Sequence, residues 1–217
     1  MERTEEFLQP SGLCDFDTCG AIRDRAARLA RGCGDNQEKF LRVFEFVREL
    51  PYGLEDWDVK ASATLAKGWG MCCGKTNLLV AMSRALSVPA RYRIFQIKAE
   101  RRLLRQVTGQ NRSLAAPLGS LPPVQDHVQC EAYLGGWRVF DPSRDMGLEN
   151  GLRKLGMPLE RVPVADARGA VHYDILASID EWARGRQESR TVRDDRELVF
   201  ARANVELDKV RRLGRHP

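Results

Sequence analysis

The chain has 217 residues, which is enough for one domain, because domains cluster near ~100–150 residues and rarely exceed ~250. Hydrophobic residues make up 43% of it and charged residues 30%, as in soluble globular proteins and unlike disordered ones. No stretch approaches the ~18 apolar residues of a membrane span, and the first ten residues are acidic where a signal peptide is basic. We therefore expect a single cytoplasmic domain over residues 1–217, with no membrane partner.

The net charge of +5 is unevenly distributed along the chain. Residues 98–126 carry a net +3 and residues 184–217 a net +4, so the remainder is slightly acidic. No zinc-finger, basic-zipper or aromatic RNA-binding signature accompanies the arginines, and we expect no nucleic-acid partner. Because the six cysteines are expected in a reducing compartment, they are interpreted as buried, metal-binding or catalytic before disulfide-bonded.

Two helices are predicted near the N-terminus. The first spans about residues 20–31, with Ile22, Ala26 and Leu29 on one stripe. For the second, Asp35 is a suitable N-cap, with Glu38 three residues later as in a capping box, and Pro51 ends the helix. This second helix opens the predicted core, which covers about residues 36–145; its apolar face consists of Phe40, Val43, Phe44 and Val47.

The centre of the chain begins with a glycine-rich segment, residues 68–74, which leads into a predicted helix over residues 75–86. That helix is apolar nearly all round, which indicates that it is buried. A strand over residues 91–97 follows, and then the basic insertion 98–126, which shows little periodicity. Long loops of this kind are usually functional, and we expect a lid or specificity loop whose arginines favour an acidic substrate.

A clearly alternating strand is predicted for residues 127–134, followed by a Gly135-Gly136 turn and a return strand over residues 137–141. Turns and a further strand near Val171 are expected in residues 143–180. The charged tail, residues 184–217, contains a predicted helix over residues 190–213. The residues expected on its inward face are Leu198, Ala201, Val205 and Val210.

The pattern of cysteine, histidine and aspartate residues points to nucleophilic catalysis. Of the three histidines, His216 is the penultimate residue, which leaves His127 and His172 as candidate bases. Cys72 and Cys73 lie where a helix begins, and a helix N-terminus lowers a thiol's pKa and offers N–H groups to an oxyanion. His127 opens a strand and Asp141 closes its neighbour, which gives the order nucleophile, base and orienting residue.

The hairpin between His127 and Asp141 allows a geometric prediction. A two-residue Gly135-Gly136 turn would point Asp141 away from His127. A three-residue loop, residues 134–136, instead sets Asp141 opposite Gln129 and diagonal to His127 on the same face, near enough for side chains to meet. Such loops favour glycine at a left-handed position, which Gly136 would supply.

Three separated blocks resemble the transglutaminase-like superfamily over about residues 40–145. The first is Gly68, Gly70 and Cys72, followed by a Leu-rich helix that ends in Ala-Leu-Ser-Val-Pro-Ala-Arg. The second is His127 at the head of a strand with Glu131 and Tyr133, and the third is the Gly-Gly-Trp turn with Asp141-Pro142-Ser143. The resemblance implies an α+β, papain-like fold in which a central helix carrying the nucleophile packs on an antiparallel sheet. It also implies that Cys72, and not Cys73, is the nucleophile, with His127 as general base and Asp141 orienting it.

The expected chemistry is attack of the Cys72 thiolate on an amide or peptide carbonyl, through a thioester that water or an amine then resolves. The Cys72 N–H is one expected oxyanion donor, and Trp69 and Gln129 are candidates for the second or for a supporting role. The sequence predicts no cofactor and no metal, and the expected partner is a peptide or protein amide, with an acidic substrate favoured.

Two alternatives to an enzyme were weighed. Cys72, Cys73, His127 and Cys130 could supply four metal ligands, but residues three apart on a strand point to opposite faces, so Cys130 would turn into the core. The second alternative is a catalytically inert transglutaminase-like scaffold that binds partners, with the charged tail helix in that role.

Overall fold

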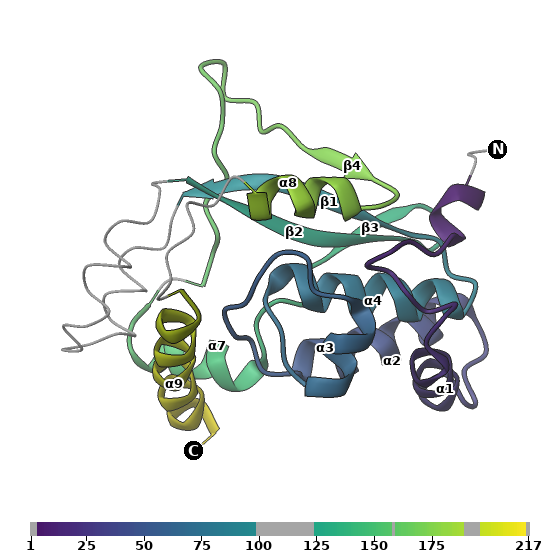
Figure 1. Ribbon diagram of the computed structural model, residues 1–217, viewed down its shortest axis with the longest axis horizontal. Coiled ribbons are helices and arrows are strands. Elements are labelled where there is room, and N and C mark those ends of the chain that lie inside the picture. Colours follow the sequence, from purple (N-terminus) through teal and green to yellow (C-terminus); the bar gives the residue numbers. More distant parts are fainter. Residues whose placement is uncertain (1–3, 99–123, 158, 189–195, 216–217) are drawn as a thin grey trace.

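A four-stranded antiparallel sheet in the order β3-β2-β1-β4 forms one layer of the molecule. The computed structural model describes residues 4–98, 124–157, 159–188 and 196–215. Within these ranges the strands are β1 (Ala90–Lys98), β2 (Val124–Tyr133), β3 (Trp137–Phe140) and β4 (Asp174–Leu176). Figure 1 shows α1 to α4 together beneath the sheet, so the molecule is built of a helical layer and a sheet layer.

The helix α4 (Cys72–Ala85) lies at the centre of the helical layer. Its residues are buried from Cys72 to Arg84, which confirms the prediction from its all-round apolar sequence. It packs on one face of β1 and β2, made of Ala90, Tyr92, Ile94, Val128, Cys130 and Ala132, all nearly inaccessible to solvent. The predicted α+β class, with a central helix against an antiparallel sheet, is therefore confirmed.

Three helices surround α4: α1 (Gly20–Leu29), α2 (Asn36–Glu49) and α3 (Ala61–Lys67). The Asp35 side chain accepts a hydrogen bond from the Glu38 N–H at 2.8 Å, which confirms the predicted cap of α2. The predicted apolar face of α2 turns inward, where the Phe40 ring contacts that of Phe140 on β3. The short α3 was not predicted, because seven residues carry too little periodicity to distinguish a helix from a loop.

The C-terminal third departs most from the sequence-based predictions. Residues 143–180 contain the helix α7 (Met146–Lys154), which was not predicted. The strand expected near Val171 is β4, which begins three residues later, at Asp174. Val171 itself forms an isolated bridge with Ala165. The tail forms two helices, α8 (Asp180–Glu188) and α9 (Arg196–Arg215). An additional short 3-10 helix, η1 (Glu5–Leu8), lies near the N-terminus.

The inward face of α9 was predicted correctly only at Val210, which is buried. Leu198 and Val205 are 51% and 55% exposed, Ala201 is also exposed, and the other buried residues are Ala203, Leu207 and Arg211. These buried residues follow a helical stripe that packs against α7, and Leu207 and Val210 form a second small core with Leu148, Leu152 and Met157. The reason for the error is that a charged residue, Arg211, occupies a core position, so that hydrophobicity alone selects the wrong stripe.

The basic insertion predicted over residues 98–126 lies mostly outside the described residues, since residues 99–123 are not among them. Its two ends are corrected: Lys98 is the last residue of β1 and residues 124–126 begin β2. The expectation of a lid therefore remains a prediction. In the described ranges, no helix is both long and apolar enough to cross a membrane.

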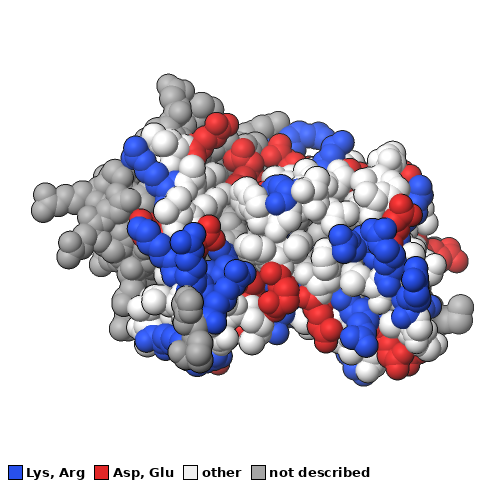
Figure 2. All heavy atoms as spheres, turned by 90° about the horizontal axis from the view of Figure 1, so that it is seen from below, with Lys and Arg blue, Asp and Glu red and all other residues white. Residues whose placement is uncertain are grey.

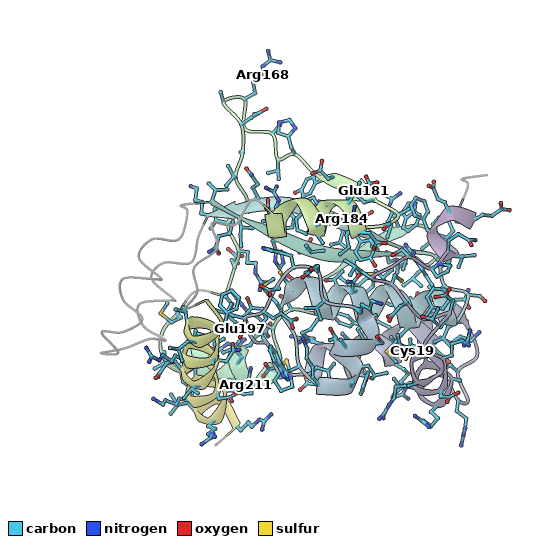
Figure 3. All side chains as sticks on the ribbon, viewed as in Figure 1. Cys19, Arg168, Glu181, Arg184, Glu197 and Arg211 are labelled. Carbon is cyan, nitrogen blue, oxygen red and sulfur yellow. The ribbon has the colours of Figure 1, made fainter. Side chains whose placement is uncertain are left out.

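Charged side chains are gathered in separate areas of the surface. Seen from below, Lys and Arg lie over the end of the molecule that holds α7 and α9 and, separately, over the end that holds α1, with acidic side chains between them (Figure 2). A second feature is a hairpin between residues 163 and 173 that projects from the body, with Arg168 at its tip (Figure 3).

Candidate active site

The β2–β3 hairpin has the register that the sequence predicted. Tyr133 pairs with Trp137 and Cys130 with Phe140, so the loop is residues 134–136, closed by a hydrogen bond from the Leu134 N–H to the Gly136 carbonyl at 2.9 Å. One detail of the prediction is wrong: the left-handed residue is Gly135, with φ of 78°, and not Gly136. The three-residue loop sets the residue after β3, Asp141, on the same face of the sheet as His127.

Asp141 and His127 are in direct contact. The distance between His127 Nε2 and Asp141 Oδ2 is 2.8 Å, although the two residues are 14 positions apart in the chain. Asp141 Oδ2 also accepts a hydrogen bond from Arg161 Nη1 at 2.8 Å, and its Oδ1 accepts one from the Ser143 N–H at 2.9 Å. The carboxylate is therefore fixed on both oxygens, which restricts the orientation of the imidazole that it contacts.

The surroundings of Asp141 favour its ionised form. Burial by itself would raise the pKa of this carboxyl, but the charge and hydrogen bond of His127, the charge of Arg161 and the hydrogen bond from Ser143 together hold the pKa well below its usual range. An ionised Asp141 stabilises a protonated imidazole at His127, as an orienting carboxylate does in a catalytic triad.

Cys72 is the first residue of α4 and lies beside the strand that carries His127. Continuing the β2–β3 register would place Pro142 opposite Val128, but β3 ends at Phe140 and proline has no N–H. The first turn of α4, and not β3, therefore binds the backbone of Val128. The Thr76 hydroxyl donates to the Val128 carbonyl at 3.2 Å, and the Val128 backbone hydrogen-bonds the Cys72 sulfur. The thiol is thus held by the residue next to His127.

The resting thiol differs from the one expected at a helix N-terminus. Burial raises the pKa of Cys72 to about 11, against the opposing effects of the Val128 hydrogen bond and the Arg161 charge. The reason is that Cys72 is only 5% exposed, so loss of solvent outweighs the helix dipole. A thiol of this kind needs a nearby base to become a nucleophile.

Cys73 has a different environment from its neighbour. Its side chain is fully buried, and its thiol donates to the Trp57 carbonyl at 3.0 Å, on the far side of the first turn from Val128. Cys130 is also fully buried, on the sheet face that packs against α4, as the alternation of β2 predicted. In the described part of the chain, no group of three or more Cys, His, Asp or Glu residues is arranged to hold a metal ion.

The two candidate supporting residues, Trp69 and Gln129, each contact a different part of the structure. The Trp69 ring packs against Gly53 and beneath the Lys67 ammonium, 4.4 Å from the ring centre. The Gln129 amide points to Asp141, with Nε2 at 3.4 Å from Oδ2. These contacts favour a packing role for Trp69 and support of Asp141 for Gln129.

The glycine-rich segment before Cys72 is fixed by a buried carboxylate. Glu55 accepts a hydrogen bond from the Met71 N–H at 2.8 Å and forms an ion pair with Lys67. A side chain at Gly74 would overlap this carboxylate, and one at Gly70 would crowd it, so glycine is needed at Gly74 for close approach. The acidic loop around Trp57, which contains Glu55, Asp56 and Asp58, thus includes a residue that positions the start of α4.

Lys75 joins the same helix to the segment that carries Asp141. Its ammonium is buried and donates to the carbonyls of Arg48 at 2.9 Å, Leu50 at 2.6 Å and Ser143 at 3.2 Å. Ser143 in turn binds Asp141 through its N–H. Burial lowers the pKa of Lys75 to about 7, and the charges of Asp145 and Asp141 oppose that change.

Sequence reasoning missed Arg161, Lys75 and Glu55 as site residues. A lysine inside an otherwise apolar helix is a signal that could have identified Lys75, since buried lysines are rare and usually paired. Arg161 had no such signal, because it follows Asp141 by 20 residues in a segment without periodicity.

A family model described as the transglutaminase-like superfamily matches residues 23–142, more than half of the chain. The matched range contains Cys72, His127 and Asp141. A curated relative, "Uncharacterized protein ML0607" from Mycobacterium leprae (strain TN), is 23% identical over 195 residues. The alignment covers 84% of this chain and 63% of the relative, so the chain spans less than two thirds of the relative's length.

Two solved structures are similar. One, from Cytophaga hutchinsonii, is named a "Putative Cysteine Protease"; it is 25% identical, with a TM-score of 0.47, over 78% of this chain and 50% of that one. The other, from Parabacteroides distasonis ATCC 8503, is named a "putative protease" and is 14% identical, with a TM-score of 0.40, over 61% of this chain and 26% of that one.

Proposed function

We propose, from the premise that the chain belongs to the transglutaminase-like superfamily of cysteine enzymes, that it is a cysteine hydrolase or acyltransferase acting on amide or peptide carbonyls. The observation that carries this proposal is the contact of 2.8 Å between His127 and Asp141. His127 immediately precedes Val128, whose backbone hydrogen-bonds the Cys72 sulfur. Cys72 is the nucleophile, His127 the general base and Asp141 the residue that orients and stabilises the imidazolium.

The reaction begins with proton transfer from the Cys72 thiol to His127. Because Nε2 faces Asp141, Nδ1 is the nitrogen that exchanges a proton with the thiol. The thiolate attacks the carbonyl carbon, and the imidazolium gives its proton to the leaving amine as the C–N bond breaks. A thioester remains, which water resolves to a carboxylate (hydrolysis or deamidation) or an amine resolves to a new amide (transamidation).

The environment of Cys72 supports base-assisted attack over a permanently ionised thiolate. With a pKa of about 11 in the closed site, the resting thiol is neutral at pH 7, and the proton leaves only when His127 accepts it. The N–H groups of the first turn of α4 are not all used within the helix, which leaves donors for the oxyanion that forms on attack.

The experiment compares Cys72→Ala with Cys73→Ala. The full chain is incubated with a library of glutamine-containing peptides, with and without a primary amine, and products and covalent protein adducts are followed by mass spectrometry. We expect turnover and a thioester adduct in the unsubstituted chain and in Cys73→Ala, and neither in Cys72→Ala. Turnover that persists in Cys72→Ala would contradict the assignment of the nucleophile.

A second candidate function is an inert scaffold of the same fold. The observation that favours it is that Cys72 is 5% and His127 2% exposed, so the proposed site is closed. Iodoacetamide labelling separates the two candidates: selective alkylation of Cys72 over the buried Cys73 supports the enzyme, and equal or absent labelling supports the scaffold.

A further inference from the structure

A cavity of about 450 Å³ is lined by Asp141. Its walls come from α2, β1, β2, the segment after β3 and residues 159–173. Of the residues in these walls, the proposed triad includes only Asp141, which Arg161 and Gln129 contact. The Arg48, Arg93 and Arg144 side chains have no assigned role in the mechanism.

The described walls of this cavity are rich in arginine, with Arg48, Arg93, Arg144 and Arg161 against the carboxylates of Asp141 and Glu149. Both carboxylates already have cationic partners. Asp141 binds Arg161 and His127, and Glu149 binds Arg48 at 2.9 Å. The lining itself thus has four arginines and two carboxylates, and this excess of positive charge attracts an anionic group.

Two donors in the cavity walls are buried without a hydrogen-bond partner among the described residues: Arg93 Nε and Ser143 Oγ. Ser143 is fully buried, and Arg93 is held in place by the Tyr173 ring, 3.7 Å away, and by Glu131 at 3.6 Å. An unsatisfied buried donor is costly, at roughly 1–3 kcal/mol each, unless an acceptor arrives. The fixed guanidinium is thus organised in advance for an acceptor that the described residues do not provide.

We propose that this cavity binds a carboxylate of the peptide substrate, either an acidic side chain or the C-terminal carboxylate, and makes the enzyme prefer acidic peptides. This inference rests on the proposed function. A planar carboxylate matches the fork of the Arg93 guanidinium, with the Ser143 hydroxyl as a further donor. A volume of about 450 Å³ suits a side chain with its adjoining backbone and is too small for a folded partner.

Arg161 connects the cavity to the proposed nucleophile. It lines the cavity, binds Asp141, and its charge favours the thiolate of Cys72. A carboxylate bound in the cavity would therefore lie beside a side chain that also acts on Asp141 and Cys72.

The test measures binding separately from turnover, in the full chain carrying Cys72→Ala. Fluorescence anisotropy is used with four labelled glutamine peptides: a flanking Glu or Gln, each with a free or an amidated C-terminus. We expect the acidic peptides to bind about tenfold more tightly than the neutral ones, since a charge-assisted hydrogen bond is at stake. Whether the flanking Glu or the free C-terminus accounts for the gain identifies the source of the carboxylate.

Arg93→Gln should abolish this preference, and Arg91→Gln is the matched control. Arg91 lies on the same strand and pairs with the same Glu131, at 2.7 Å, but does not line the cavity. We expect the control to keep the tenfold preference. Loss of the preference in both variants, or in neither, would overturn the assignment to this cavity.

Two further outcomes decide the proposal independently of how the variants fold. Equal binding of acidic and neutral peptides to the Cys72→Ala chain overturns it. So does displacement of the acidic peptide by inorganic phosphate at concentrations where acetate has no effect, because the site would then be a phosphate site. Neither result touches the proposed function, which is tested separately by the turnover of the unsubstituted chain and of Cys72→Ala.

Discussion

Around α4 and the sheet the buried side chains are mostly apolar, whereas the contact between α7 and α9 combines a small apolar core with close-packed glycines and a buried ion pair. In the first region, α4 contributes Leu78, Leu79, Val80 and Met82 to a large continuous core. In the second, a side chain at Gly151 or Gly214 would overlap the backbone of the facing helix, so the two helices touch at backbone distance. The first region tolerates changes by repacking, and the second has little room to adjust.

The helix pair also supports the proposed site through polar contacts. Arg211 of α9, on the side that faces α7 in Figure 3, binds Asp145 with Nε at 3.0 Å from both carboxylate oxygens and donates to the Tyr52 carbonyl. Asp145 lies four residues after Asp141 and accepts the Tyr52 N–H at 3.0 Å. The segment that follows Tyr52 includes Glu55, which fixes the residue before Cys72. The C-terminal helix thus contacts both segments that flank the proposed triad.

The largest loss of stability is expected from breaking the ion pair between Arg211 and Asp145. Arg211→Leu leaves Asp145 buried without its cation and should lower the free energy of unfolding by about 3–5 kcal/mol, measured by urea denaturation. Arg212→Leu, at an exposed position of the same helix, is the control and should change it by less than about 0.5 kcal/mol. Similar losses of stability in both variants would mean that the Arg211–Asp145 ion pair does not stabilise the packing of α9.

The next largest effect is expected at the helix contact. Gly151→Ala forces α7 away from the Val210 carbonyl and should lower the free energy of unfolding by about 1–3 kcal/mol. Gly185→Ala is the matched control: it lies in α8 with no atom within 4 Å of the added Cβ, and should be stabilising by about 0.5–1 kcal/mol. The comparison of the two regions would be wrong if Gly151→Ala were as harmless as Gly185→Ala.

The buried Lys75, which links α4 to Ser143, should make the free energy of unfolding depend on pH. Its pKa is about 7 in the folded chain, against an ordinary value of 10.5, so above pH 7 the unfolded state binds the proton that the folded state releases. The contribution of Lys75 to stability therefore rises with pH between about 7 and 10 and is lost as pH falls through 7, by up to about 1.4 kcal/mol per pH unit.

Urea denaturation at several pH values from 6 to 9, for the unsubstituted chain and Lys75→Met, measures this effect. We expect the difference in unfolding free energy between the two proteins to grow with pH in favour of the unsubstituted chain. A constant difference would show that Lys75 does not change its protonation on unfolding.

The smallest effect is expected at the cap of α2, in the apolar region. Asp35→Ala removes the acceptor of the Glu38 N–H and should cost about 1 kcal/mol. Asp24→Ala, at an exposed position of α1, is the control and should be nearly neutral, with both variants followed by thermal unfolding. If Asp35→Ala lowered the free energy of unfolding as much as Arg211→Leu, the expectation that a buried ion pair contributes more than an exposed helix cap would be wrong.

The sequence by itself determined the central helix, the α+β class, the cap of α2 and the register of the β2–β3 hairpin. These features depend on residues close in the chain, whose periodicity and loop length restrict the backbone to few conformations. Because the loop length fixes which residues face each other, the contact between His127 and Asp141 followed from local information.

Only the tertiary structure decided which charged residues are buried and what they contact. Arg161 reaches Asp141, Arg211 reaches Asp145 and Lys75 reaches Ser143 across 20, 66 and 68 positions of the chain. Burial likewise reversed the expected pKa shift of Cys72 and placed Arg211 on the inner stripe of α9. A charged side chain is stable inside a protein only when distant partners compensate for its lost hydration, and a local pattern carries no record of those partners.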